Sequence, residues 1–264
     1  MAAKTILLTG GSGRIGRCLR YALRDEYRLR LFNRSAIPDL GANETLIQGD
    51  TADARAVEEA ARGADVLVDM AGVSDVQPFR ERLLPTNILG TYNVFEAARL
   101  GGVPRVVYAS THHVIGYYRP EERVDETVPL RPDSMYAVTK CFAEAVGRLY
   151  ADKAGLEVVC LRIGLFGPRP TEERHLAVWI SPGDMARLVR ASVEAPGIRF
   201  EIAYGISKNT RRWWDLSRAR DVLGYDPQDD AEGYAAELLR EPPSAWQGRI
   251  GRQGGPKLDL PFMP

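Results

Sequence analysis

The sequence predicts an α/β protein built on a doubly wound parallel sheet. Two observations indicate this class: short apolar runs alternate with amphipathic segments, and the first apolar run breaks directly into a glycine-rich turn that opens a helix. A chain of 264 residues can hold one large domain with a full core. We therefore expect a single compact unit, in which residues 1–168 form the nucleotide-fold domain and residues 169–264 a small substrate-binding part packed on it.

The glycine turn follows the first predicted strand, residues 5–9, whose apolar character is typical of a buried parallel strand. Glycines at positions 10, 13 and 16 lie between this strand and an amphipathic helix. Glycine permits a tight turn and lets the backbone approach a diphosphate, while the helix N-terminus offers unpaired amides. This order of strand, glycines and helix predicts a dinucleotide site of the Rossmann type; a glycine turn without a ligand is the alternative.

The second predicted strand, residues 28–32, ends in Asn33 and Arg34. In nucleotide folds an acidic side chain here accepts hydrogen bonds from the adenosine ribose, whereas an arginine accommodates a 2′-phosphate. The acid is missing and Arg34 stands beside the expected site, which favours NADP. A solvated loop arginine is the alternative interpretation.

The other elements continue the alternation. Strands are predicted over residues 45–51, 66–72, 105–109, 157–164 and 200–204, and helices near 53–60, 87–100, 136 onward, 184–193 and 216–223. Ligands of such sheets gather at the carboxyl ends of the strands, so we expect Asp50, Gly72 and Thr111 to meet around one crevice. The Asp50 carboxylate could accept the adenine amino group or cap the following helix. The tail from Glu241 lacks periodicity and is expected to wrap over the surface or over a neighbouring subunit.

Charge and cysteine content exclude several classes of partner. Lysine and arginine number 35, as do aspartate and glutamate, which argues against an electrostatic grip on nucleic acid or acidic membrane. The three cysteines, Cys18, Cys141 and Cys160, have no metal-like spacing and predict reduced thiols. The chain opens without a signal peptide and has no run of membrane-spanning length, so a cytoplasmic protein is expected.

Tyr136 and Lys140 are four residues apart and lie one turn apart on the same side of a predicted helix. A lysine ammonium beside a phenol favours the phenolate, so the tyrosine can act as a general base near neutral pH. This spacing alone is common by chance. It gains weight here from the N-terminal glycine turn and from the hydroxyls of Ser110 and Thr111 after the fifth strand.

This combination resembles the extended short-chain dehydrogenase/reductases. The resemblance implies that Thr111 polarises the substrate oxygen, that Tyr136 is the acid/base, and that Lys140 lowers the tyrosine pKa and holds the nicotinamide ribose. It also implies a homo-oligomer paired through helices such as the one that begins at Tyr136. The cofactor-binding residues expected on all these grounds are Gly10, Gly13, Arg14, Ile15, Gly16, Asn33, Arg34, Asp50, Thr51, Met70, Ala71, Gly72, Tyr136, Lys140 and Ile163.

Longer segments resemble the uronate dehydrogenases over almost the whole chain. They are residues 110–118, 136–142, 162–164 and 213–215, together with Arg174 and Trp179. The resemblance implies NAD as cofactor, no metal, and oxidation of the anomeric carbon of a hexuronic acid, glucuronate or galacturonate, to an aldarolactone. An arginine suits the substrate carboxylate because its planar fork gives two parallel charge-assisted bonds. The implied substrate-binding residues are Ser74, Thr111, His112, His113, Tyr136 and Arg174.

Three positions depart from that family's pattern. His112 stands where the family has an asparagine, and Leu165 stands where it has a serine; both differences bear on which sugar is bound. Asn33 stands where the family has the acid that favours NAD. Two other functions stay open: an epimerase or dehydratase acting on a sugar nucleotide, and a non-catalytic dinucleotide sensor. The first would require a larger C-terminal part, and a dehydratase an Asp-Glu pair at 112–113. The second would be expected to lack Tyr136 or Lys140.

Overall fold

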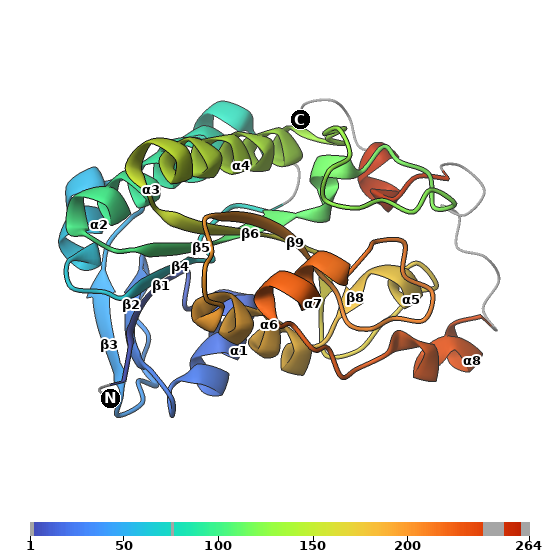
Figure 1. Ribbon diagram of the computed structural model, residues 1–264, viewed down its shortest axis with the longest axis horizontal. Coiled ribbons are helices and arrows are strands. Elements are labelled where there is room, and N and C mark those ends of the chain that lie inside the picture. Colours follow the sequence, from blue (N-terminus) through green and yellow to red (C-terminus); the bar gives the residue numbers. More distant parts are fainter. Residues whose placement is uncertain (1–2, 75–76, 240–250, 260–264) are drawn as a thin grey trace.

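The structure, a computed structural model, describes residues 3–74, 77–239 and 251–259. Its centre is a seven-stranded parallel sheet in the order β3-β2-β1-β4-β5-β6-β9 (Figure 1). The strands are β1 (Thr5–Thr9), β2 (Arg28–Asn33), β3 (Glu44–Gln48), β4 (Val66–Asp69), β5 (Arg105–Thr111), β6 (Glu157–Ile163) and β9 (Phe200–Gly205). The strand order runs outward in both directions from β1 and β4, which confirms the predicted doubly wound α/β fold.

Helices cover both faces of the sheet (Figure 1). One layer holds α2 (Ala54–Ala61), α3 (Gly90–Gly101) and α4 (Met135–Ala154), and the other holds α1 (Arg14–Leu23), α6 (Pro182–Glu194) and α7 (Ser217–Leu223). Side chains alternate along a strand, so Leu7 packs into the first layer while Ile6 and Leu8 pack into the second. The near-continuous apolar runs of the strands follow from this burial on both faces.

Residues 87–100 are helical as predicted, but the helical segment begins earlier, at Phe79. A π-helix, η1 (Phe79–Leu89), precedes α3 and contains Pro85. The amide of Gly90 donates to the carbonyl of Pro85, five residues back, which is the π-helical spacing. Asn87 is therefore buried inside the π-helix and is not at the start of an α-helix.

Several short elements lie where no periodic pattern could indicate them. They are β7 (Leu165–Phe166), α5 (His175–Val178), β8 (Trp179–Ile180) and α8 (Ala235–Leu238), together with the 3₁₀-helices η2 (His112–Ile115), η3 (Ala231–Tyr234) and η4 (Gly255–Asp259). The predicted strands 45–51 and 66–72 end earlier, at Gln48 and Asp69, because the residues that follow leave the sheet. Most of the tail from Glu241 lies outside the described residues.

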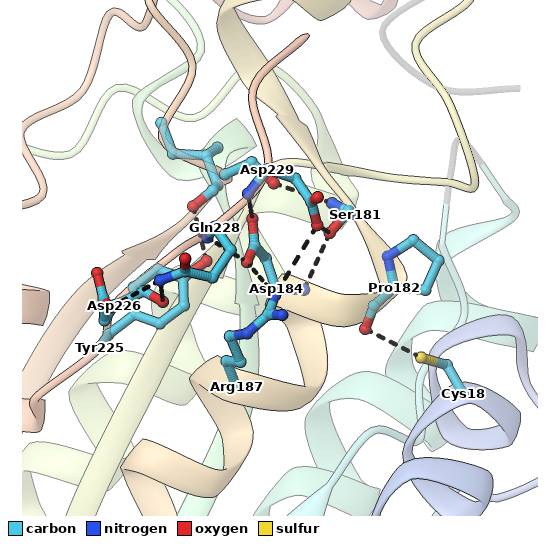
Figure 2. Close-up of polar contacts among 11 residues, drawn as sticks. Cys18, Ser181, Pro182, Asp184, Arg187, Tyr225, Asp226, Gln228 and Asp229 are labelled. Carbon is cyan, nitrogen blue, oxygen red and sulfur yellow. Dashed lines mark hydrogen bonds and ion pairs between the residues drawn. The ribbon is translucent and has the colours of Figure 1, made fainter.

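The part of the chain beyond residue 168 is tied to the sheet. Strand β9 pairs with β6, and Asp184 in the first turn of α6 is fully buried. Its carboxylate accepts hydrogen bonds from the amides of Gln228 at 2.7 Å and Asp229 at 3.0 Å and from Arg187 at 2.7 Å (Figure 2). This network fixes the loop after α7 to the helix layer. The division at residue 168 stays a prediction about where substrate binding begins, since the sheet itself continues past it.

No helix in the described part of the chain is long and apolar enough to cross a membrane.

Candidate active site

The turn between β1 and α1 depends on glycine. Gly10 has a φ of +67°, and a Cβ there would lie 2.8 Å from the carbonyl oxygen of Met70. A Cβ at Gly16 would lie 2.1 Å from the carbonyl oxygen of Gly10. Gly13 is the N-cap of α1 and offers no side chain, so no side chain caps the first amides of this helix. The turn is therefore a cradle that side chains would fill, with the positive end of a helix dipole directed at it.

A cleft of about 210 Å³ opens beside this turn, at the carboxyl ends of the first four strands. It is lined by Gly10, Ser12, Gly13, Phe32, Asn33, Arg34, Ser35, Gly49, Asp50, Thr51, Met70, Ala71, Gly72 and Thr86. Most of the predicted cofactor residues thus meet around one crevice. Of the other predicted cofactor residues, Arg14 donates a hydrogen bond to the carbonyl of Phe166. Ile15 and Gly16 lie within α1, and Ile163 is the last residue of β6.

The rim of the cleft carries the groups expected to choose the cofactor. The Asn33 side chain turns into the glycine loop, where its oxygen accepts from the Ser12 amide and hydroxyl. Arg34 is exposed and lies 3.8 Å from the Asp50 carboxylate. Of the two roles considered for Asp50, helix capping belongs to Asp53, which accepts from the Ala56 amide at 3.1 Å. Asp50 itself faces the cleft.

Lys140 is buried in α4, whose first turn is capped by the Ser134 hydroxyl. Its ammonium donates to the Ala109 carbonyl at 2.7 Å and to the Tyr108 hydroxyl at 3.1 Å, and lies 5.9 Å from the centre of the Tyr136 ring. Burial lowers the pKa of Lys140 to about 8. Below that pH the ammonium persists, and a positive charge beside the phenol favours its ionisation.

The same ammonium lies against the cofactor cleft. A Cβ on Gly72 would be 3.5 Å from the Lys140 Nζ. Asn87 holds this loop in place: its side chain pairs with the amide and carbonyl of Val73 at 2.8 and 2.9 Å and donates to Thr139 of α4 at 3.1 Å. Ser74 follows and is exposed. The cleft and the Tyr136–Lys140 pair are therefore parts of one site.

The end of β5 brings hydroxyl and imidazole groups to this site. Thr111 is buried and its hydroxyl accepts from the His113 amide at 3.3 Å, which turns the chain into η2. His113 Nδ1 bonds the Asp133 carboxylate at 2.6 Å, and its ring meets the Tyr136 ring edge-on at 6.3 Å between centroids. Thr111, His113 and Tyr136 thus lie together.

Arg174 is buried and lies beside His112. Its Nη2 donates to the carbonyl of Gln253 at 2.6 Å and meets His112 Nε2 at 3.0 Å. Burial lowers the pKa of Arg174 to about 10. Its Nε is buried and has no hydrogen-bond partner among the described residues. A buried donor of a charged group gains most from an anionic partner, so this side chain is suited to hold a carboxylate.

Sequence reasoning missed several residues that shape the site. Asn87, Asp133 and Gln253 each act through contacts with distant parts of the chain, and no local pattern marks Asn87 or Gln253. The weak signal for Asp133 was its position immediately before the capped helix α4. Trp214, within one of the segments that resemble the uronate dehydrogenases, is fully buried and stacks on His112.

Comparison with known proteins gives the family. The sequence pattern of the NAD dependent epimerase/dehydratase family matches residues 6–197, from β1 to just beyond α6. The chain belongs to this family.

Within the epimerase/dehydratase family the chain is similar to uronate dehydrogenases. It is 40% identical over 263 residues to the uronate dehydrogenase of Agrobacterium fabrum, with 98% of each chain covered. It is 40% identical over 253 residues to that of Pseudomonas putida, with 95% of this chain and 94% of the relative covered. The crystal structure of an alanine variant of the Agrobacterium tumefaciens enzyme complexed with NAD superposes with a TM-score of 0.93 at 40% identity, with 99% of both chains covered. The predicted resemblance to uronate dehydrogenases is confirmed.

Proposed function

We propose that this family member is an NAD-dependent dehydrogenase that oxidises the anomeric carbon of a hexuronic acid, such as glucuronate or galacturonate, to an aldarolactone. The observation that carries the proposal is that the Lys140 ammonium lies both beside the Tyr136 ring and against the dinucleotide cleft. Arg174, whose buried Nε has no partner among the described residues, supplies a donor for a carboxylate. The full-length similarity to uronate dehydrogenases supports the same activity.

The glycine cradle and the uncapped end of α1 fit the diphosphate of a nicotinamide dinucleotide. Bound in the cleft, such a cofactor supplies an acceptor for hydride. Tyr136 removes the proton of the anomeric hydroxyl, and the Lys140 ammonium stabilises the phenolate. Thr111 donates a hydrogen bond to the same substrate oxygen.

The remaining groups orient the sugar. Arg174 holds the carboxylate, while Ser74 and His113 bond ring hydroxyls; Asp133 fixes the ring of His113. Both ring nitrogens of His112 are engaged within the chain, by Ile163 and Arg174, so its predicted direct contact with the sugar stays a prediction. No step requires a metal.

The residues at the site favour neither alternative function. A dehydratase would need an Asp-Glu pair where His112 and His113 stand, and a sensor would not need both Tyr136 and Lys140 beside the cleft.

The unpaired state of Cys18, Cys141 and Cys160 supports the proposed cytoplasmic location.

Arg34 is proposed to admit NADP as well as NAD. Its exposed guanidinium lies at the cleft rim, and no acid at the end of β2 repels a 2′-phosphate. Arg34→Asp is expected to raise the ratio of kcat/KM for NAD to that for NADP by about 10- to 100-fold, because a charge-assisted bond is lost. Steady-state kinetics with both cofactors measure the ratio, with Arg34→Gln separating lost attraction from new repulsion. An unchanged ratio in both variants would show Arg34 to be a bystander.

The protein is proposed to form a homo-oligomer through the α3–α4 layer. Leu84 and Leu89 of η1, Tyr92 of α3 and Leu149 of α4 are each 41–54% exposed, an apolar content typical of subunit contacts. Light scattering coupled to gel filtration is expected to give a multiple of the 29.3 kDa chain mass. A monomer at micromolar concentration would refute this proposal and leave the chemistry untouched.

A further inference from the structure

His112 makes two hydrogen bonds, one from each ring nitrogen. Its Nδ1 lies 3.0 Å from the carbonyl oxygen of Ile163 at the end of β6. Its Nε2 lies 3.0 Å from Nη2 of Arg174. The imidazole therefore bridges the sheet and the arginine proposed to hold the substrate carboxylate.

These partners fix the protonation state of the ring. A carbonyl oxygen only accepts, so Nδ1 carries the proton, and a guanidinium only donates, so Nε2 offers its lone pair. Only the neutral imidazole satisfies both. Burial, together with the charges of His113 and Arg174, lowers the pKa of His112 well below its usual value, in agreement with a neutral ring.

The ring is also held in place. It stacks on Trp214 with 5.1 Å between centroids, and Trp214 is fully buried and donates its Nε1 to the Gln253 side chain at 2.8 Å. The Gln253 backbone carbonyl is the second acceptor for the same Nη2 of Arg174. Two fixed acceptors thus engage one end of the guanidinium fork, while Nε stays without a partner among the described residues.

We propose that His112 is a positioning residue for Arg174. By accepting from Nη2, it sets the orientation in which the fork presents its other donors to the carboxylate of the sugar acid. It acts through the arginine, since both of its ring nitrogens are engaged within the chain. The proposal rests on the proposed function, in which Arg174 binds that carboxylate.

Two amide variants separate the bonds of His112. In His112→Asn the amide lies near the former Nδ1, so the bond to Ile163 is kept and the acceptor for Arg174 is lost. In His112→Gln the longer side chain can place its carbonyl oxygen near the former Nε2, which keeps the acceptor and gives up the Ile163 bond. Asparagine is the family's residue at this position by the resemblance described above, so the fold is expected to tolerate it.

The experiment measures the change in the KM for glucuronate and compares it with the changes in kcat and in the KM for NAD. His112→Asn is expected to raise the KM for glucuronate by about 10-fold or more, the scale of one hydrogen bond to a charged group, with kcat and the KM for NAD near wild type. His112→Gln is expected to keep the KM for glucuronate close to wild type. A purely structural role of the ring would instead impair both variants alike.

Each other outcome overturns the proposal. An unchanged KM in His112→Asn, or equal losses in both variants, removes the positioning role while the proposed function stands. If His112→Asn does not fold, the test depends on His112→Gln. A tenfold rise in the KM for glucuronate in a folded His112→Gln also removes the positioning role. Absence of turnover of any uronic acid by the wild-type protein overturns the proposed function, and the positioning role with it.

Discussion

Replacing Tyr136 with phenylalanine is expected to lower kcat with glucuronate by about 10²- to 10⁴-fold, the usual contribution of a positioned acid or base. The proposed role of the phenol is proton transfer, and the ring contacts with His113 and Lys140 persist in the variant. Affinity for NAD is therefore expected to stay near wild type. Initial rates at saturating substrate give kcat, and fluorescence titration gives the affinity for NAD.

Tyr150→Phe is the matched control for this experiment. It makes the same change on the same helix, but its hydroxyl bonds Glu96 at 2.7 Å, away from the cleft. Its kcat should equal that of wild type. Retained turnover in Tyr136→Phe would refute the role of Tyr136 as base, and joint loss of NAD binding would show a structural role instead.

Replacing Arg174 with methionine is expected to lower kcat/KM for glucuronate by about 30-fold or more. Removing one member of a buried, hydrogen-bonded charge pair costs about 2–5 kcal/mol, and each 1.4 kcal/mol is a factor of ten. Arg174→Lys is expected to recover little, because an ammonium cannot reproduce the planar fork. Initial rates over a range of glucuronate concentrations measure the loss, and the KM for NAD should not change.

Arg169→Met controls for the loss of an arginine from the same segment. Arg169 is exposed and pairs with Glu237, so its replacement should leave kcat/KM near wild type. If Arg174→Met retained wild-type kcat/KM for glucuronate, the carboxylate would have to bind elsewhere.

The sequence allowed the sheet and the cofactor cleft to be predicted because both depend on local patterns. Buried parallel strands appear as apolar runs, and Gly10 and Gly16 are required by the backbone geometry of a single turn. The cleft then follows from topology, since strand ends meet at one edge of the sheet.

The surroundings of the reactive groups could not be predicted in this way. His113 meets Asp133 across 20 residues, and Arg174 meets Gln253 across 79, through contacts that only the folded chain brings together. The π-helix over residues 79–89 has no periodic pattern of its own, so the sequence does not indicate that the helical segment begins eight residues before Asn87. The replacement of the family's asparagine by His112 was visible in the sequence, but its bond to Arg174 was not.

The most direct measurement is the absorbance of reduced nicotinamide in mixtures of the protein, NAD and one sugar at a time. Glucuronate and galacturonate are expected to give NADH at rates far above those with glucose and galactose, which lack the carboxylate for Arg174. Turnover of a neutral sugar or a ketone, with none of any uronic acid, would contradict the assignment of a carboxylate-bearing substrate to this site.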